Sequence, residues 1–148
     1  MRISRITAFH EAGHAVAALR NGLLFDHVTA VPDEAYETDG ALHWDELITA
    51  GDVAPHPHLL AIVLLAGACA EARLRGRAFD RVFAGDAAGD DREAIATMGL
   101  SDEEFIAAGR AVVALIDHEW PAIERVAHEL LKGAPLQYAD VVRIADPA

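Results

Sequence analysis

The first pattern along the chain lies within residues 3–20, where apolar residues recur every three or four positions, as on one face of an amphipathic helix. These positions are Ile6, Phe9, Gly13, Val16 and Ala17. The sequence Arg-Asn-Gly at 20–22 then supplies a stop signal. The β-branched segment HVTAVP, residues 27–32, predicts a short strand, and GALHW, residues 40–44, predicts a second strand that returns after an acidic loop.

The rest of the chain has helical patterns. Its long apolar run is too long for a strand and predicts a buried core helix. Ser101 and Glu104 form a capping box at the start of another helix, and Pro121 suits the first turn of a third. A turn-rich break covers residues 85–91. The predicted helices are residues 59–74, a short helix that ends near residue 98, and residues 102–118, 121–131 and 136–144.

These elements predict a mainly helical fold with a small β-hairpin or short sheet. A chain of 148 residues, of which 53% are apolar, can bury the core of one domain, so residues 1–148 are assigned to a single domain. The formal net charge is -12 with histidine neutral. This charge argues against a nucleic-acid partner, because phosphate binding needs a cationic surface, and against docking on anionic lipid.

The chain is expected to be cytoplasmic and to have no membrane partner. Its single cysteine, Cys69, can form no disulfide within the chain, which suits a reducing compartment. Polar residues at positions 10, 11 and 14 stand where a signal peptide would need an apolar core. The apolar run from Leu59 to Ala70 has 12 residues, too few to cross a bilayer.

The candidate chemistry lies in HEAGH, residues 10–14, within the first predicted helix. His10 and His14 are four positions apart, so both imidazoles face one side of a helix and can bind one metal ion. Glu11 lies about 100° around the helix from the first histidine. From there it can take a proton from a water molecule that the ion activates. The spacing therefore predicts two zinc ligands and a general base.

Two other His-Glu pairs lack this pattern. His118 is followed at the matching position by Ala122, and His128 is followed there by Lys132. Neither pair offers a second imidazole, so both are interpreted as solvated helix residues.

Four more histidines and one strand are open to two interpretations. His56 and His58 are assigned to an exposed loop, and His27 and His43 lie near the predicted hairpin, where they could approach a cleft. The strand over residues 28–32 could bind an extended substrate at a sheet edge, or it could be purely structural.

A catalytic zinc ion usually has three protein ligands, so one is missing from the pentapeptide. No histidine lies between Ala17 and Leu24, and Glu34 and Glu37 fall in the predicted acidic loop. The third ligand must therefore come from farther along the chain.

Several segments together resemble the peptidase domain of FtsH-type metalloproteases. The segment TAFHEAGHAVAAL, residues 7–19, followed by VTAVP, is similar to the family's HEAGHA helix and the short strand after it. LLAGACAEARLRG, GDAAGDDREAIATM and HELLKGAPLQYADVVRI resemble later segments of that domain, in the same order. The resemblance covers the chain from about Thr7 to Ile144 and implies an FtsH-peptidase-like helical domain.

The resemblance implies that His10, His14 and Asp91 bind Zn²⁺ and that Glu11 is the general base. Asp91 matches the aspartate of the family's Asn-Asp pair, and Asp90 replaces the asparagine. Asp90 is the competing ligand, and both aspartates could instead cap the helix that follows.

The resemblance also marks Glu71, which matches the first glutamate of the family's Ala-Glu-Glu segment. It could orient a histidine ligand through a hydrogen bond, or it could be a partly exposed helix carboxylate. The chain departs from the family in lacking the ATPase domain, since it contains no Gly-x-x-x-x-Gly-Lys phosphate loop. The family's arginine after the glycine of the Leu-x-Gly-Arg segment is Ala68 here.

The expected function is hydrolysis of peptide bonds by a zinc metalloendopeptidase without its own ATPase motor. The alternative is a peptidase-like binding or assembly module that retains the metal site. The candidate partners are an unstructured peptide or protein substrate, a separate ATPase, and further copies of the chain in a homo-oligomer.

Overall fold

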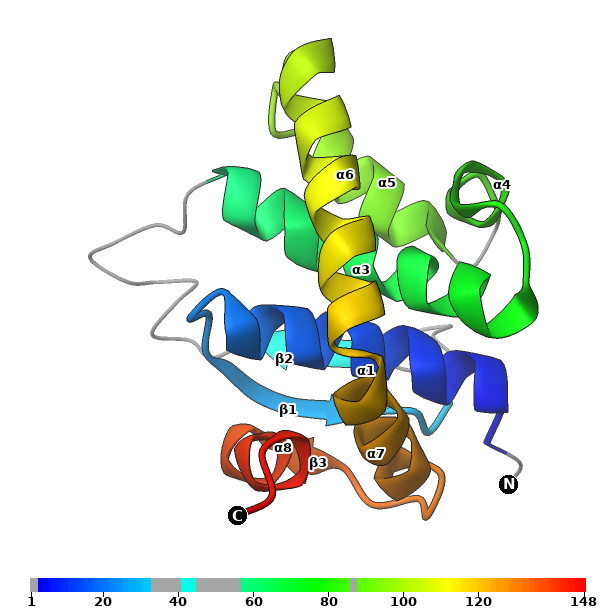
Figure 1. Cartoon of the computed structure of the whole chain (residues 1–148), viewed down its shortest axis with the longest axis vertical. Helices are drawn as coiled ribbons and strands as arrows, with labels where there is room; N and C mark the ends of the chain where they lie inside the picture. Colours follow the sequence, from blue (N-terminus) through cyan, green and yellow to red (C-terminus); the bar gives the residue numbers. More distant parts are fainter. Residues whose placement is uncertain (1–2, 33–40, 45–56, 86–87) are drawn as a thin grey trace.

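The computed structural model describes residues 3–32, 41–44, 57–85 and 88–148 (Figure 1). The fold is mainly helical with a small antiparallel sheet, as the sequence predicts. The helices are α1 (Arg5–Arg20), α3 (Pro57–Arg75), α4 (Phe79–Phe83), α5 (Gly89–Ala96), α6 (Asp102–His118), α7 (Trp120–Leu130) and α8 (Tyr138–Ala145). The strands are β1 (Phe25–Thr29), β2 (Ala41–Trp44) and β3 (Leu136–Gln137).

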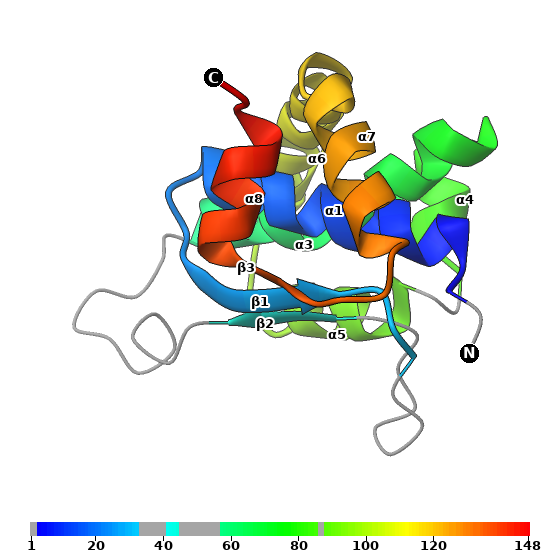
Figure 2. The same ribbon diagram turned by 90° about the horizontal axis from the view of Figure 1, so that it is seen from below.

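Helix α1 is the central element. It contacts α3, α7, α8 and the sheet, and Figure 2 shows α7 and α8 on one side of it and the strands on another. Every residue from Ala8 to Ala18 is buried. The prediction of a one-sided apolar face is therefore wrong, because neighbouring elements enclose the helix and its small alanine side chains pack all round.

Helix α3 lies against α1 and is the other element buried along most of its length. It has 19 residues, more than the 12-residue apolar run at its centre suggested. By length and composition it could cross a membrane, so the expectation that it is too short is wrong. However, 61% of its most apolar stretch of 18 residues is buried inside the protein. Packing in the protein core is therefore sufficient to explain its apolar composition.

The sheet has the strand order β2-β1-β3, with both pairs antiparallel. Val28 of β1 pairs with Leu42 on one side and with Leu136 on the other. The predicted strand therefore begins two residues earlier than expected and lies in the middle of the sheet, so Val28 offers no free edge to a substrate. The acidic loop expected at residues 33–39 lies outside the described residues.

The C-terminal helix starts later than predicted. Residues 136–137 pair with β1 as a short strand, so α8 begins at Tyr138. The side chain of Asp140 accepts a hydrogen bond from the backbone N–H of Gln137 at 3.0 Å and caps this helix start. A long-range strand pairing therefore overrides the local helical pattern at these two positions.

The capping box at the start of α6 is confirmed. The Ser101 side chain accepts a hydrogen bond from the Glu104 N–H, and the Glu104 carboxylate accepts one from the Ser101 N–H. Pro121 lies in the first turn of α7, as predicted.

The segment between α3 and α6 contains a helix that the sequence did not predict, α4. The guanidinium of Arg92 on α5 donates to the carbonyl oxygens of Phe83 at 2.6 Å and Gly85 at 2.5 Å. These bonds tie α5 to the end of α4. The N-cap of α5 is Ala88 and makes no side-chain capping bond, so neither Asp90 nor Asp91 is the N-cap of this helix.

The close approach of α1 to α3 depends on Gly13. A Cβ atom at this position would lie 2.6 Å from the carbonyl oxygen of Ala66 and 2.7 Å from the Cβ of Ala70. Both distances are well inside van der Waals contact, and one of them is to backbone that cannot move without shifting α3. Only glycine allows the two helices to lie this close.

We therefore predict that Gly13→Ala destabilises the fold by about 1–3 kcal/mol, the usual range for overpacking a core. Gly109→Ala is the matched control, because Gly109 is also within a helix and a Cβ there meets nothing within 4 Å. That control should raise stability by up to about 1 kcal/mol through helix propensity. Urea unfolding with a metal chelator present measures both, and equal stability of the two variants would contradict the close crossing.

Candidate metal centre

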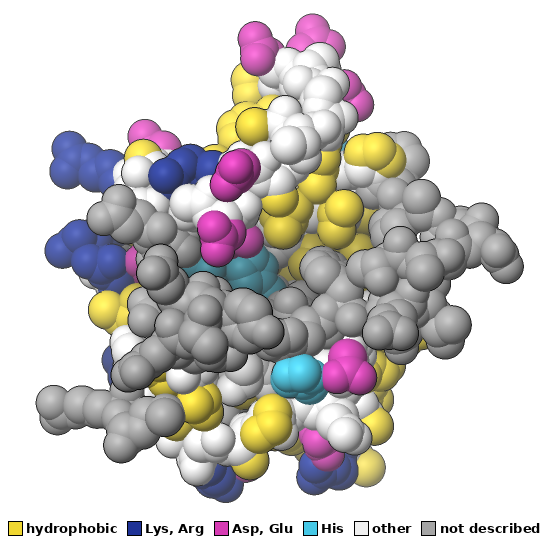
Figure 3. All heavy atoms as spheres, turned by 180° about the vertical axis from the view of Figure 1, so that it is seen from behind, with side chains coloured by type: hydrophobic (Ala, Val, Ile, Leu, Met, Phe, Trp, Pro, Cys, Tyr) yellow, Lys and Arg dark blue, Asp and Glu magenta, His cyan; other side chains and the backbone are white. Residues whose placement is uncertain are grey.

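The two histidines of the pentapeptide lie in the middle of α1 and face α3. Both are buried, His10 with 6% and His14 with 5% of its surface exposed. Their ring centroids are 4.9 Å apart, as expected for residues four apart on a helix. In Figure 3, histidine side chains are visible near the centre of one face of the molecule, next to acidic side chains.

Each histidine has a polar partner for its Nδ1 atom. His14 Nδ1 lies 2.7 Å from the carbonyl oxygen of Val63, which can only accept, so this nitrogen carries the proton and donates. His10 Nδ1 lies 3.3 Å from Oε1 of Glu71. Partners of this kind fix the orientation of the ring and leave Nε2 available for a metal ion.

Asp91 lies close to the Nε2 atoms of both histidines. Its Oδ2 atom lies 3.4 Å from Nε2 of His10 and 3.2 Å from Nε2 of His14. Typical N–H···O hydrogen bonds are shorter, about 2.9 Å. Ligand atoms around a tetrahedral zinc ion lie about 3.3–3.6 Å apart when each is 2.0–2.2 Å from the ion. The two distances from Asp91 to the histidines are close to that spacing.

His10, His14 and Asp91 are thus a group that could hold a metal ion, with all three ligand atoms within 4.8 Å of one another. Asp90 is exposed at the surface of α5 and is not part of this group. Of the two adjacent aspartates, the structure brings only Asp91 to the histidines.

Gly67 on α3 has no side chain, and the Nε2 atoms of the two histidines lie close to where its Cβ atom would be. A Cβ atom there would lie 2.3 Å from Nε2 of His14 and 2.6 Å from Nε2 of His10. Any side chain at this position would therefore displace the two nitrogens. This role was not predicted from the sequence, although a glycine inside an otherwise apolar helix is a signal of close approach.

Glu11 lies beside the group and is 7% exposed. Among buried side-chain oxygens and nitrogens in the described part of the chain, its Oε2 is the one without a hydrogen-bond partner. Burial raises the pKa of Glu11, an effect that the neighbouring histidines partly offset. A buried carboxylate oxygen with no protein partner is costly, and such an atom calls for a functional explanation.

The pKa values of His10, His14 and Asp91 depend on one another. Burial by itself would lower the pKa of His10, but its contacts with Asp91 and Glu71 raise it to about 10. For His14, burial lowers the pKa and Asp91 raises it, with a net increase. Burial raises the pKa of Asp91 and the two histidines lower it, with a net decrease. Without an ion, protons on the imidazoles therefore balance the charge of the carboxylate.

Glu71 is 3% exposed, so it is not the partly exposed carboxylate that was one of the two interpretations. Its Oε1 faces His10, and its Oε2 accepts a hydrogen bond from Nη1 of Arg75 at 2.8 Å. The hydrogen bond with His10 lowers the pKa of Glu71, and the bond from Arg75 adds to this effect. Arg75 was not predicted as a partner of Glu71, although its position four residues later on the same helix is the signal that would identify it.

The remaining histidines lie elsewhere. His118 and His128 are exposed on α6 and α7, as predicted. His27 pairs with His43 across the sheet. His58 lies in the first turn of α3 and is half-buried, so its assignment to an exposed loop is wrong. His56 lies outside the described residues.

The chain was compared with models of known protein families and with curated proteins, and neither comparison gave a match. What the geometry establishes is the class of site: a buried His-His-Asp group that could hold a metal ion, with a partnerless carboxylate oxygen beside it.

The adjacent aspartates give a matched pair for testing this site. We predict that Asp91→Asn weakens zinc binding by about tenfold or more, because a charged oxygen ligand becomes a neutral one. Asp90→Asn makes the same chemical change one residue away and should bind zinc like the wild type. Competition with a zinc-binding dye measures both affinities, and equal losses in the two variants would remove Asp91 from the ligand group.

Zinc affinity should also rise with pH. The pKa values of both imidazoles are raised when no metal is bound, which favours protonated rings, and an ion must displace these protons. Between pH 6 and 8 the apparent affinity is expected to increase by about tenfold per pH unit for each proton released. Calorimetric titration in buffers of different ionisation enthalpy counts these protons, and an affinity that does not change with pH would contradict the assignment.

Proposed function

We propose that the chain is a zinc-dependent peptidase that hydrolyses peptide bonds. The observation that carries this proposal is the position of Glu11, whose Oε2 atom is buried without a hydrogen-bond partner beside the His-His-Asp group. A metal site that served only to stabilise the fold would have no use for this additional carboxylate, which is not a ligand. A general base needs such a free oxygen.

Zinc is the ion that the donor set favours. Two imidazole nitrogens and one carboxylate oxygen are a common zinc donor set, and three protein ligands leave one coordination position open for chemistry. A zinc ion held by His10, His14 and Asp91 would act as a Lewis acid on a peptide carbonyl and make a water molecule acidic at neutral pH.

Glu11 moves the proton in this proposal. Its free oxygen takes a proton from the attacking water molecule and then passes it to the amine that leaves. Burial raises the pKa of Glu11 above the usual carboxylate range, and so brings it closer to neutral pH, where a group can both accept and return a proton. Glu71 and the Val63 carbonyl keep the two imidazoles in orientation while this happens.

The resemblance to FtsH-type peptidases supports the same function, with His10, Glu11, His14 and Asp91 matching the family's motif. The substrates in this proposal are unstructured peptides, or proteins that a separate ATPase unfolds. An extended peptide could add to the sheet at β2, which pairs on one side with β1 among the described strands. The cytoplasm is the expected location.

The test of this proposal compares Glu11→Gln with Glu103→Gln. Both remove one carboxylate, but Glu103 is exposed in the first turn of α6. We expect Glu11→Gln to bind zinc stoichiometrically and to cleave peptides at least about 100-fold more slowly than the wild type, as for loss of a general base. Glu103→Gln should retain both properties.

Zinc content is measured by mass spectrometry, and cleavage is measured with unstructured peptides that carry a quenched fluorophore. If Glu11→Gln cleaves as fast as the wild type, Glu11 is not the base. A wild type that holds zinc and cleaves no peptide would instead favour the binding or assembly module.

A further inference from the structure

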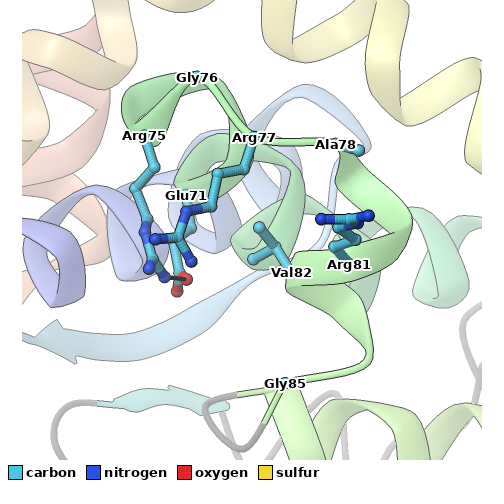
Figure 4. Close-up of a pocket in the computed structure, with 8 residues that line it drawn as sticks. All are labelled: Glu71, Arg75, Gly76, Arg77, Ala78, Arg81, Val82 and Gly85. Carbon is cyan, nitrogen blue, oxygen red and sulfur yellow. Dashed lines mark hydrogen bonds and ion pairs between the residues drawn. The ribbon is translucent and has the colours of Figure 1, made fainter.

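A pocket of about 830 Å³ lies beside the candidate metal centre, at the end of α3 and the start of α4 (Figure 4). Three of its lining residues are arginines: Arg75, Arg77 and Arg81. The whole chain has only 12 lysines and arginines and a net charge of -12, so a quarter of its cationic side chains meet at one small pocket. A local concentration of positive charge on an acidic protein calls for a specific explanation.

The charges within the pocket do not cancel. Glu71 is the one acidic residue of the lining, and both of its oxygens are occupied, one by Arg75 and the other by His10. In the part of the chain that the structure describes, the guanidinium groups of Arg77 and Arg81 form no hydrogen bond or ion pair. Among the described residues these two positive charges are therefore unpaired, and a bound anion would relieve their mutual repulsion.

The pocket is connected to the metal centre through a single side chain. The Glu71 carboxylate faces the pocket with Oε2, which Arg75 contacts, and faces His10 with Oε1. Figure 4 shows Arg75 and Arg77 projecting on the same side as Glu71, with Arg81 on the facing helix. On the face shown in Figure 3, lysine and arginine side chains gather along one edge, next to the area where histidines are visible.

We propose that this pocket binds a carboxylate group of the peptide substrate, close to the bond that is cleaved. This inference rests on the proposed function, because the substrate is placed by the metal centre next to the pocket. Guanidinium groups bind carboxylates with two parallel hydrogen bonds, which fits a site that contains several arginines. The carboxylate is either the C-terminus of the peptide or the side chain of an aspartate or glutamate.

The size of the pocket fits this ligand. Its volume is in the range of sites that hold a small molecule, and it is large enough for a side chain or a terminal residue with its carboxylate. A nucleic acid is a poor alternative, since the negative charge of the rest of the chain opposes a phosphate backbone that would extend beyond the pocket.

The test is a binding experiment that does not depend on hydrolysis. Three fluorescently labelled peptides are compared: one with a free C-terminal acid, one of the same sequence with a C-terminal amide, and one with the amide in which an internal glutamine is replaced by glutamate. Their affinity for the zinc-loaded Glu11→Gln variant is measured by fluorescence anisotropy. We expect at least one acidic peptide to bind about tenfold more tightly than the neutral amide, the effect of one charge-assisted contact.

Variants of the pocket residues then test whether the arginines cause the preference for an acidic peptide. The double variant Arg77→Gln/Arg81→Gln should remove the preference for the acidic peptide and leave the binding of the neutral amide unchanged. Arg143→Gln is the control, since Arg143 is an exposed arginine on α8 whose side chain pairs with Asp140. It should keep the full preference. Which of the two acidic peptides binds more tightly identifies the C-terminus or the side chain as the source of the carboxylate.

The proposal is overturned if the three peptides bind equally, if none binds, or if the double variant keeps the preference. Cleavage of the same peptides by the wild type separates this result from the proposed function. If the wild type cleaves all three at the same rate, the peptidase stands and the carboxylate pocket fails. If the acidic peptide binds through Arg77 and Arg81 but none is cleaved, the pocket stands and the peptidase fails.

Discussion

The close packing of α1 against α3 is the constraint on which the rest of the structure depends. Gly13 on α1 and Gly67 on α3 are both positions where a Cβ atom would collide with the opposite helix. The short distance between the helices lets the imidazole of His14 reach a backbone carbonyl of α3, and lets His10 reach the Glu71 carboxylate. The geometry of the candidate metal centre is therefore a consequence of how tightly two helices pack.

A single line of charged groups runs from the surface into this packed region. It begins at Arg75, continues through Glu71 to His10, and ends at Asp91, with alternating sign at each step. Isolated buried charges are strongly unfavourable, but each of these has an opposite charge in contact. An ion bound between the histidines would replace their protons in the same electrostatic balance. An anion bound in the pocket lined by Arg75, Arg77 and Arg81 could therefore affect the charge of His10 through Glu71.

Local sequence predicted the bounds of a helix well where the residues of the helix itself determine where it begins and ends. The helix that carries the pentapeptide and the helix that starts at Ser101 were both predicted close to their observed bounds, because periodicity and capping act over a few neighbouring residues. The failures have long-range causes. Residues 136–137 form a strand since β1 lies beside them, and α1 is buried all round since helices and strands from the rest of the chain enclose it.

In the candidate site too, some features follow from local sequence and others only from the folded structure. The i, i+4 spacing was enough to place His10 and His14 on one face of a helix with Glu11 beside them, because helix geometry is the same in every protein. No local rule could choose between Asp90 and Asp91, or foresee the carbonyl of Val63 and the glycine at position 67. Those choices belong to the folded chain, because they depend on which atoms α3 and α5 bring to α1 from fifty to eighty residues away.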